Sequence, residues 1–228
     1  MKLSKLVVAA AVVTLLWIPA AVQGQDRLET ILKEMEKAGR GITSLKADIH
    51  QKKYTVLLKQ FDAGESGKIY FRKAKDGNAE LRREISKPTP NFLVVTGGVA
   101  TFFQPVINQV TVRDLGKDKD KAEFMVLGFG ATTRALKETY NIRYLGAEKI
   151  DGKQVEKIEL VPRSDKFKAL FASIVMNLDT KRWIPISNKL TEANGDYLLI
   201  SFDDISLNPK LKDSLFKLKL PKNVQKVG

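Results

Sequence analysis

The stretch GDYLLISFDDISLNPKLKDSLFKLKLPKNV, residues 195–224, decides the fold predicted for this chain. It opens with an acidic and polar turn, and residues 197–202 then alternate in hydrophobicity, which is the period of a strand with one apolar face. A spacer that contains Asn208 follows, and a second strand is predicted at residues 216–220, just before Pro221. The stretch therefore predicts the closing strands of a sheet.

The same alternation recurs along the chain and predicts a mainly β fold. Further strands are predicted at residues 45–50, 67–72, 80–85, 92–95, 100–103, 142–144, 156–161, 172–178 and 183–190. Turn-forming tracts rich in glycine, asparagine and aspartate separate several of them, at residues 75–78, 97–98, 151–152 and 194–195. An open sheet of about ten twisted strands curls, because it otherwise leaves edges and one face to cover. With no repeat and no linker, the sequence predicts a single curled-sheet domain.

Helical patterns are few. An amphipathic helix is predicted from its N-cap, Asp26, to Gly39, and short helices are predicted at residues 124–127 and 133–140. So few helices cannot cover a large sheet as a layer. We expect them to lie at one mouth or on the inner side of the curled sheet, where they would act as a plug or lid. Wide sheets of this kind hold ligands and narrow ones pack solid, so a ligand cavity and an ordinary core both stay open at this point.

The N-terminus has the pattern of an export signal. Lys2 and Lys5 precede an apolar run at residues 6–21, which is shorter than the ~20 residues of a membrane span. We expect a cleaved signal peptide at residues 1–24, a mature domain at residues 25–228 and a periplasmic location. An uncleaved membrane anchor is the alternative.

Composition narrows the function classes. The chain has no cysteine, which excludes disulfides, thiolate catalysis, cysteine-based zinc sites and lipid modification of a cysteine after the apolar run. The formal net charge is +13, but lysines are interspersed with acids, as in residues 117–121. Mixed charges of this kind are typical of a solvated surface, with attraction to an anionic membrane as the alternative. Export argues against a nucleic-acid partner.

The sequence offers no candidate for catalysis, a metal site or a cofactor. Its single histidine, His50, lies on a predicted strand and is interpreted as a polar surface residue. The Gly-Phe-Gly tract at residues 128–130 lacks the context of a dinucleotide site and is interpreted as a hinge or helix break. Asp203 and Asp204 are adjacent on a strand, so their side chains should point to opposite faces. We expect a protein that is not an enzyme.

Several segments together resemble the periplasmic outer-membrane lipoprotein carrier (LolA-like) family. The resemblance is carried by the opening helix with ITSLKADIHQ (42–51), by GKIYFRK (67–73), by LRREISKP (81–88), by the aromatic segment 97–110, by residues 124–127 and 140–142, and by Gly195, Asp196, Phe202, Asn208, Phe216, Pro221 and Val224. It covers essentially the whole mature chain. The order and spacing of the segments carry it, rather than any single motif.

The resemblance implies a mainly β protein with a few helices, built as an incomplete antiparallel β-barrel with a helical lid over a hydrophobic cavity. It also implies a function. Family members receive acylated lipoproteins from an inner-membrane ABC transporter complex and pass them to an outer-membrane acceptor. We expect a monomer without cofactor. A carrier of free lipid or glycolipid, and a module that senses lipoproteins or lipids, are the alternatives.

Large apolar side chains supply the predicted ligand cavity, because adaptable aromatic and methionine side chains suit an acyl chain. The predicted cavity residues are Ile69, Phe71, Phe102, Phe103, Phe124, Met125, Leu127, Ile174, Met176, Leu178, Ile200 and Phe202. By position in the family, a basic residue that helps to hold the lid falls on Lys73, preceded by Arg72. The chain departs from the family pattern at two places: Ala74 replaces a proline, and Arg83 replaces a tryptophan.

Overall fold

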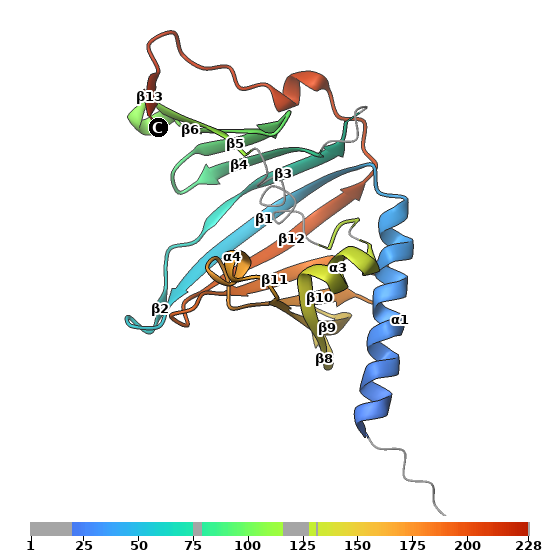
Figure 1. The fold of residues 1–228 in the computed structure, drawn as a ribbon. Helices are drawn as coiled ribbons and strands as arrows, with labels where there is room; N and C mark the ends of the chain where they lie inside the picture. Colours follow the sequence, from blue (N-terminus) through green and yellow to red (C-terminus); the bar gives the residue numbers. More distant parts are fainter. Residues whose placement is uncertain (1–19, 75–78, 116–127, 131, 228) are drawn as a thin grey trace, which may run out of the picture.

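One large sheet dominates the computed structural model, which describes residues 20–74, 79–115, 128–130 and 132–227 (Figure 1). The strands of the sheet follow the order β13-β7-β6-β5-β4-β3-β1-β12-β11-β10-β9-β8, with β2 beside β1. They are β1 (Ser44–Thr55), β2 (Gln60–Phe61), β3 (Glu65–Lys73), β4 (Ala79–Lys87), β5 (Asn91–Thr96), β6 (Val99–Gln104), β7 (Gln109–Asp114), β8 (Tyr140–Ile150), β9 (Lys153–Pro162), β10 (Ser173–Asp179), β11 (Pro185–Thr191), β12 (Tyr197–Leu207) and β13 (Gln225–Val227). Neighbours pair antiparallel except β13 and β7, which are parallel. The mainly β, open and curled sheet predicted from the sequence is confirmed.

Helical elements are short apart from the first. They are α1 (Ala20–Arg40), α3 (Thr133–Thr139) and α4 (Asp165–Lys168), with the 3-10 turns η1 (Pro105–Ile107) and η3 (Asp213–Phe216). The helix predicted at residues 133–140 is confirmed as α3, which Thr132 caps by accepting a hydrogen bond from the Ala135 N–H. The helix predicted at residues 124–127 and the turn predicted at residues 75–78 lie outside the described residues.

The inner face of the sheet, defined here as the face on which α1 packs, carries two apolar clusters. In the first half, around β8–β11, Ile31, Leu32 and Met35 of α1 and Leu136 of α3 pack onto buried strand side chains such as Met176. Each of these residues is at most 3 % exposed, so this half is a closed core. The helical spacing of the α1 residues is the pattern that predicted the helix.

An ion pair with a buried carboxylate fixes α1 on this half. Arg27 of α1 binds the carboxylate of Glu156 on β9, which also accepts a hydrogen bond from the Tyr144 hydroxyl at 2.7 Å. Because the Glu156 side chain is only 5 % exposed, each partner is needed to offset the cost of burying its charge. The hydrogen bond to Glu156 raises the pKa of Arg27.

The second half of the inner face, around β1, β3, β4 and β5, is covered differently. Its cluster contains Ile49, Ile69, Leu81 and Ile85, and none of its described members belongs to a helix. Phe129, from the loop before α3, packs there with its ring centroid 5.3 Å from that of Phe202. This half of the described structure has no helical cover.

The Gly-Phe-Gly tract at residues 128–130 joins the two halves. A Cβ at Gly128 would lie 2.2 Å from Met176 Cε, and a Cβ at Gly39, at the end of α1, would lie 2.7 Å from Gly130 Cα. Gly128 and Gly130 also have positive φ angles of 90° and 98°. Glycine is favoured at Gly39 because a Cβ there would meet the backbone of Gly130, and at Gly128 and Gly130 because of their positive φ angles. The tract predicted as a hinge or helix break is therefore a packed joint.

Three predictions about elements are wrong. Residues 216–220 form no strand. The segment instead lies against outer-face side chains, and Phe216 packs under Arg72, whose guanidinium lies 4.5 Å from the ring centroid. Asp26 does not begin a helix, because α1 already begins at Ala20. Trp183 has a φ of 55° and lies in the turn before β11 rather than in the strand.

Candidate functional site

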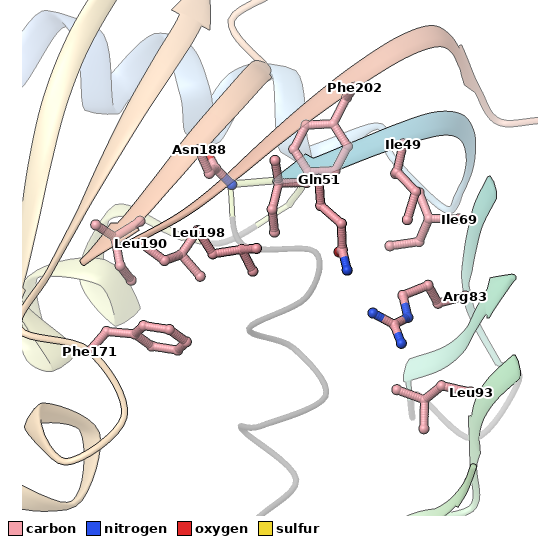
Figure 2. Close-up of a pocket in the computed structure, with 12 residues that line it drawn as sticks. Ile49, Gln51, Ile69, Arg83, Leu93, Phe171, Asn188, Leu190, Leu198 and Phe202 are labelled. Carbon is pink, nitrogen blue, oxygen red and sulfur yellow. The ribbon is translucent and has the colours of Figure 1, made fainter. Parts of the chain in front are cut away.

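A cavity of about 260 Å³ opens on the inner face (Figure 2). It is lined by Ile49, Gln51, Ile69, Arg83, Leu93, Phe171, Ile174, Asn188, Leu190, Leu198, Ile200 and Phe202. Apart from Phe171, which lies between α4 and β10, these residues belong to strands β1, β3, β4, β5, β10, β11 and β12. The site is thus built on the sheet itself rather than on loops.

Strand register brings the lining residues together. Ile69, Arg83 and Leu93 are directly opposite one another on β3, β4 and β5. On the other side of the cavity, Leu198 on β12 is opposite Leu190 on β11, which is opposite Ile174 on β10. Directly paired residues share a face of the sheet with their Cβ atoms about 5 Å apart. The row on β10, β11 and β12 forms a continuous apolar floor, whereas Arg83 interrupts the row on β3, β4 and β5.

The cavity is chemically asymmetric. Nine of its twelve lining side chains are apolar, and the other three are Gln51, Arg83 and Asn188. Figure 2 shows the Gln51 amide and the Arg83 guanidinium projecting into the cavity from one side, with Phe171, Leu190 and Leu198 on the other. An apolar cavity with a few convergent polar groups is the usual form of a small-molecule site.

Few protein partners satisfy the polar groups. Gln51 Nε2 donates to a carboxylate oxygen of Glu65, and Arg83 Nη2 donates to Asn91 Oδ1 at 3.0 Å. Among the residues that the structure describes, Arg83 Nε and Asn188 Oδ1 are buried without a hydrogen-bond partner. Burial lowers the pKa of the Arg83 guanidinium, and the Glu65 carboxylate partly opposes that shift.

The structure divides the predicted cavity residues into several groups. Ile69, Ile174, Ile200 and Phe202 line the cavity. Phe71, Met176 and Leu178 are buried in the two inner-face clusters, and Phe102 is half-buried opposite Leu93. Phe103 lies on the outer face, opposite Phe92, in a groove beneath the C-terminal segment. Phe124, Met125 and Leu127 lie outside the described residues.

The two basic residues predicted by position as a lid latch have different surroundings. Arg72 pairs with Glu80 and with Asp213, and its guanidinium covers Phe216, so it holds the C-terminal segment on the outer face. The Lys73 backbone N–H donates to the Thr43 carbonyl at 2.8 Å. A Cβ placed on Gly130 would lie 3.8 Å from Lys73 Nζ, which puts this ammonium beside the packed joint.

Sequence reasoning missed the polar residues of the cavity. Arg83 stands between Leu81 and Ile85 on the inner face of β4, and each of these is only 1 % exposed. An arginine on the apolar face of an alternating strand was the signal that could have identified it. Gln51 and Asn188 give no such signal, because polar residues at single positions are common in half-buried strands.

The described residues offer no constellation for metal chemistry. No group of three or more histidine, cysteine, aspartate or glutamate side chains there could hold an ion. His50 is an exposed side chain whose Nδ1 lies 2.9 Å from Ser66 Oγ, as the prediction of a polar surface residue implies. Asp204, next to Asp203, has a φ of 47° at an irregularity in the pairing of β12 with β1. Of the helices described, none is long and apolar enough to cross a membrane.

Comparison with known proteins places this geometry in a family. The sequence profile of the family described as "Outer membrane lipoprotein carrier protein LolA" matches residues 40–219. The chain belongs to the LolA family. The match runs from the end of α1 to the C-terminal segment and so includes every residue that lines the cavity. The family resemblance read from the sequence is confirmed.

One relative and two solved structures are similar to this chain. The chain is 24 % identical over 216 residues to an outer-membrane lipoprotein carrier protein of Chromohalobacter salexigens, covering 95 % of this chain and 92 % of the relative. An uncharacterized conserved protein from Thermus thermophilus has a similar fold, with a TM-score of 0.55, 14 % identity, and coverage of 88 % of this chain and 98 % of that one. A chain of the Pseudomonas aeruginosa MucA/MucB complex matches with a TM-score of 0.50 and 13 % identity, over 85 % of this chain and 61 % of that one. These structural likenesses concern the fold.

Proposed function

We propose that this protein is a periplasmic carrier that shelters the acyl chains of lipoproteins in the inner-face cavity and shuttles them from the inner to the outer membrane. The observation that carries the proposal is the cavity itself, which has nine apolar side chains. It lies between the two halves of the inner face, and the half around β1, β3, β4 and β5 has no helical cover among the described residues. Membership of the LolA family and the carrier name of the Chromohalobacter relative support it.

The physical case rests on the cost of exposing hydrocarbon to water. Each methylene removed from water contributes about 0.8 kcal/mol, so an acyl chain needs a continuous apolar path to cross an aqueous compartment. The rows of Leu198, Leu190 and Ile174 provide such a path. In this proposal an inner-membrane ABC transporter complex loads the protein, and an outer-membrane acceptor unloads it.

The test is the identity of the bound cargo. The full chain, expressed with its own N-terminal segment, is purified from the periplasm, and native mass spectrometry followed by lipid extraction identifies the molecules bound to it. Acylated lipopeptides or lipoproteins are the expected result. Free lipids or glycolipids alone would favour the lipid-carrier alternative over lipoprotein transport, and protein without any acyl species would overturn the proposal.

Two matched variants locate the cargo. Leu198→Trp places a large ring in the cavity, whereas Leu199→Trp places the same ring at a neighbouring position that is 36 % exposed on the outer face. We expect the first variant to lose at least about tenfold in bound acyl species and the second to resemble the unmodified protein. Equal loading of the two variants would show that cargo binds elsewhere.

A further inference from the structure

Arg83 is a charged side chain in a cavity whose lining is mostly apolar. Its strand neighbours on the same face, Leu81 and Ile85, are fully buried, and its cross-strand partners are Ile69 and Leu93. A lysine or arginine among such neighbours is rare unless it is paired, because desolvation of a charge is costly. The guanidinium nevertheless points into the cavity (Figure 2).

The protein offers this guanidinium little compensation. An arginine side chain has five N–H donors and stays protonated in proteins. In the part of the chain that the structure describes, one of these donors has an acceptor, the neutral amide oxygen of Asn91, and Nε is buried without any. The nearest acid in electrostatic terms is Glu65, whose carboxylate binds the Gln51 amide, and no ion pair joins it to Arg83 within the described residues.

A contrast within the same chain shows how a paired arginine looks. Arg27 lies against a largely buried carboxylate, Glu156, and the two charges compensate each other directly. Arg83 is more deeply buried than Arg27 but has no carboxylate partner among the described residues. Groups that are buried and incompletely satisfied in a native protein call for an explanation, and an absent ligand is one such explanation.

We propose that the cavity binds an amphiphile whose head group is an anion, a carboxylate or a phosphate, with this anion at Arg83 and the hydrocarbon tail along the opposite wall. The planar guanidinium forms paired hydrogen bonds with both kinds of oxyanion. The tail then lies over Leu198, Leu190 and Phe171, which face Arg83 across the cavity in Figure 2. This inference rests on the proposed carrier function and adds the charge of the cargo to it.

The experiment compares ligands that differ only in the head group. Isothermal titration calorimetry of the delipidated full chain measures the affinity for 1-decanol, decanoate, decyl phosphate and inorganic phosphate. Because a hydrogen bond to a charged group strengthens binding by about tenfold or more, decanoate and decyl phosphate should bind at least about tenfold more tightly than decanol. Arg83→Gln should remove this preference, so that decanol, decanoate and decyl phosphate bind with similar affinity.

Control variants separate position from charge. Arg143→Gln removes one positive charge from an exposed outer position, where the side chain pairs with Glu159, and should keep the preference. Arg83→Lys keeps a charge at the site and should retain part of the preference, because lysine lacks the planar fork. Decanol binding is measured for every variant and shows whether the cavity of that variant still takes up a decyl chain.

The outcomes distinguish the two proposals. If decanol and the anions bind with equal affinity, or if Arg83→Gln keeps the preference, the anionic head group is overturned while the carrier function stands. If none of the decyl ligands binds, the carrier cavity itself is overturned. If inorganic phosphate binds as tightly as decyl phosphate, the site recognises free phosphate and the amphiphile inference is overturned.

Discussion

Neighbouring arginines on β4 show how differently the two faces of the sheet treat the same side chain. On the outer face, Arg82 pairs with Glu84, donates from Nη1 to the Leu215 carbonyl at 2.9 Å and lies 5.4 Å from the Phe92 ring centroid. On the inner face, Arg83 has one hydrogen bond among the described residues, to Asn91. The contacts of Arg82 are therefore structural, whereas most of the donors of Arg83 have no protein acceptor among the described residues and could bind a ligand.

The comparison shows that the partners of a charged side chain, rather than the charge itself, indicate whether its role is structural. The outer face uses Arg72 and Arg82 to hold the C-terminal segment, through Asp213, Phe216 and the Leu215 carbonyl. Each of these contacts has an obvious structural role. On the inner face the guanidinium of Arg83 lies at the edge of the cavity, and for this reason we propose that it binds a ligand.

The largest expected effect is a loss of stability on removing a phenylalanine ring, and it should differ between Phe129 on the inner face and Phe216 on the outer face. Phe129→Ala removes a ring that is 3 % exposed and packs on Phe202 at the joint of the inner face, so we expect a loss of about 3–5 kcal/mol in the free energy of unfolding. Phe216→Ala should cost less globally, because the C-terminal segment can detach locally from the sheet. Urea unfolding measures the first effect, and hydrogen exchange at residues 209–219 measures the second. Equal global losses would contradict the assignment of Phe216 to a detachable segment.

The next largest effect concerns Arg82 and Arg83, whose substitutions should change the free energy of unfolding in different directions. Arg82→Gln removes an ion pair and a hydrogen bond to a backbone carbonyl, and should lower the free energy of unfolding by about 2 kcal/mol. Arg83→Gln relieves a buried charge that has no carboxylate partner among the described residues, and should leave stability unchanged or raise it. Urea unfolding of the ligand-free proteins tests both. A large loss for Arg83→Gln would mean that Arg83 has a structural role after all.

The smallest effect concerns the acid nearest to Arg83. The Glu65 carboxylate acts electrostatically on Arg83 and repels an incoming anion, so Glu65→Gln should strengthen the binding of decanoate about threefold while leaving that of decanol unchanged. Calorimetry at low ionic strength measures the change, since salt screens it. Weaker decanoate binding by this variant would indicate that Glu65 positions the cavity through its hydrogen bond with Gln51.

Local patterns predicted much of the fold and part of the cavity. The alternation in residues 45–50 and the glycines at 97–98 correctly placed β1 and the hairpin of β5 and β6, because both signals depend only on adjacent residues. The same alternation in residues 216–220 predicted a strand that does not exist. There the apolar residues pack on the outer face, and arginine side chains rather than a neighbouring strand contact the segment.

For the predicted cavity residues, too, residue type was visible in the sequence but the face of the sheet was not. Phe102 and Phe103 were indistinguishable by type, yet the pleat places Phe102 opposite Leu93 on the inner face and Phe103 opposite Phe92 on the outer face. From the sequence, Arg83 was noted as a departure from a family pattern, and its place between Leu81 and Ile85 on an alternating strand was a further signal. Its significance appears once Ile69, Leu93 and the empty space beside them are placed around it.

By itself, the sequence determined which residues share a strand face, because the two-residue period of a strand is local, and it determined the family, because motif order is written along the chain. Only the tertiary structure decided which faces meet. The pairing of β1 with β12 joins Ile49 to Phe202, more than a hundred residues apart, and creates the cavity between two halves of the sheet. Pairing over such distances depends on how the whole sheet assembles, and no local pattern encodes it.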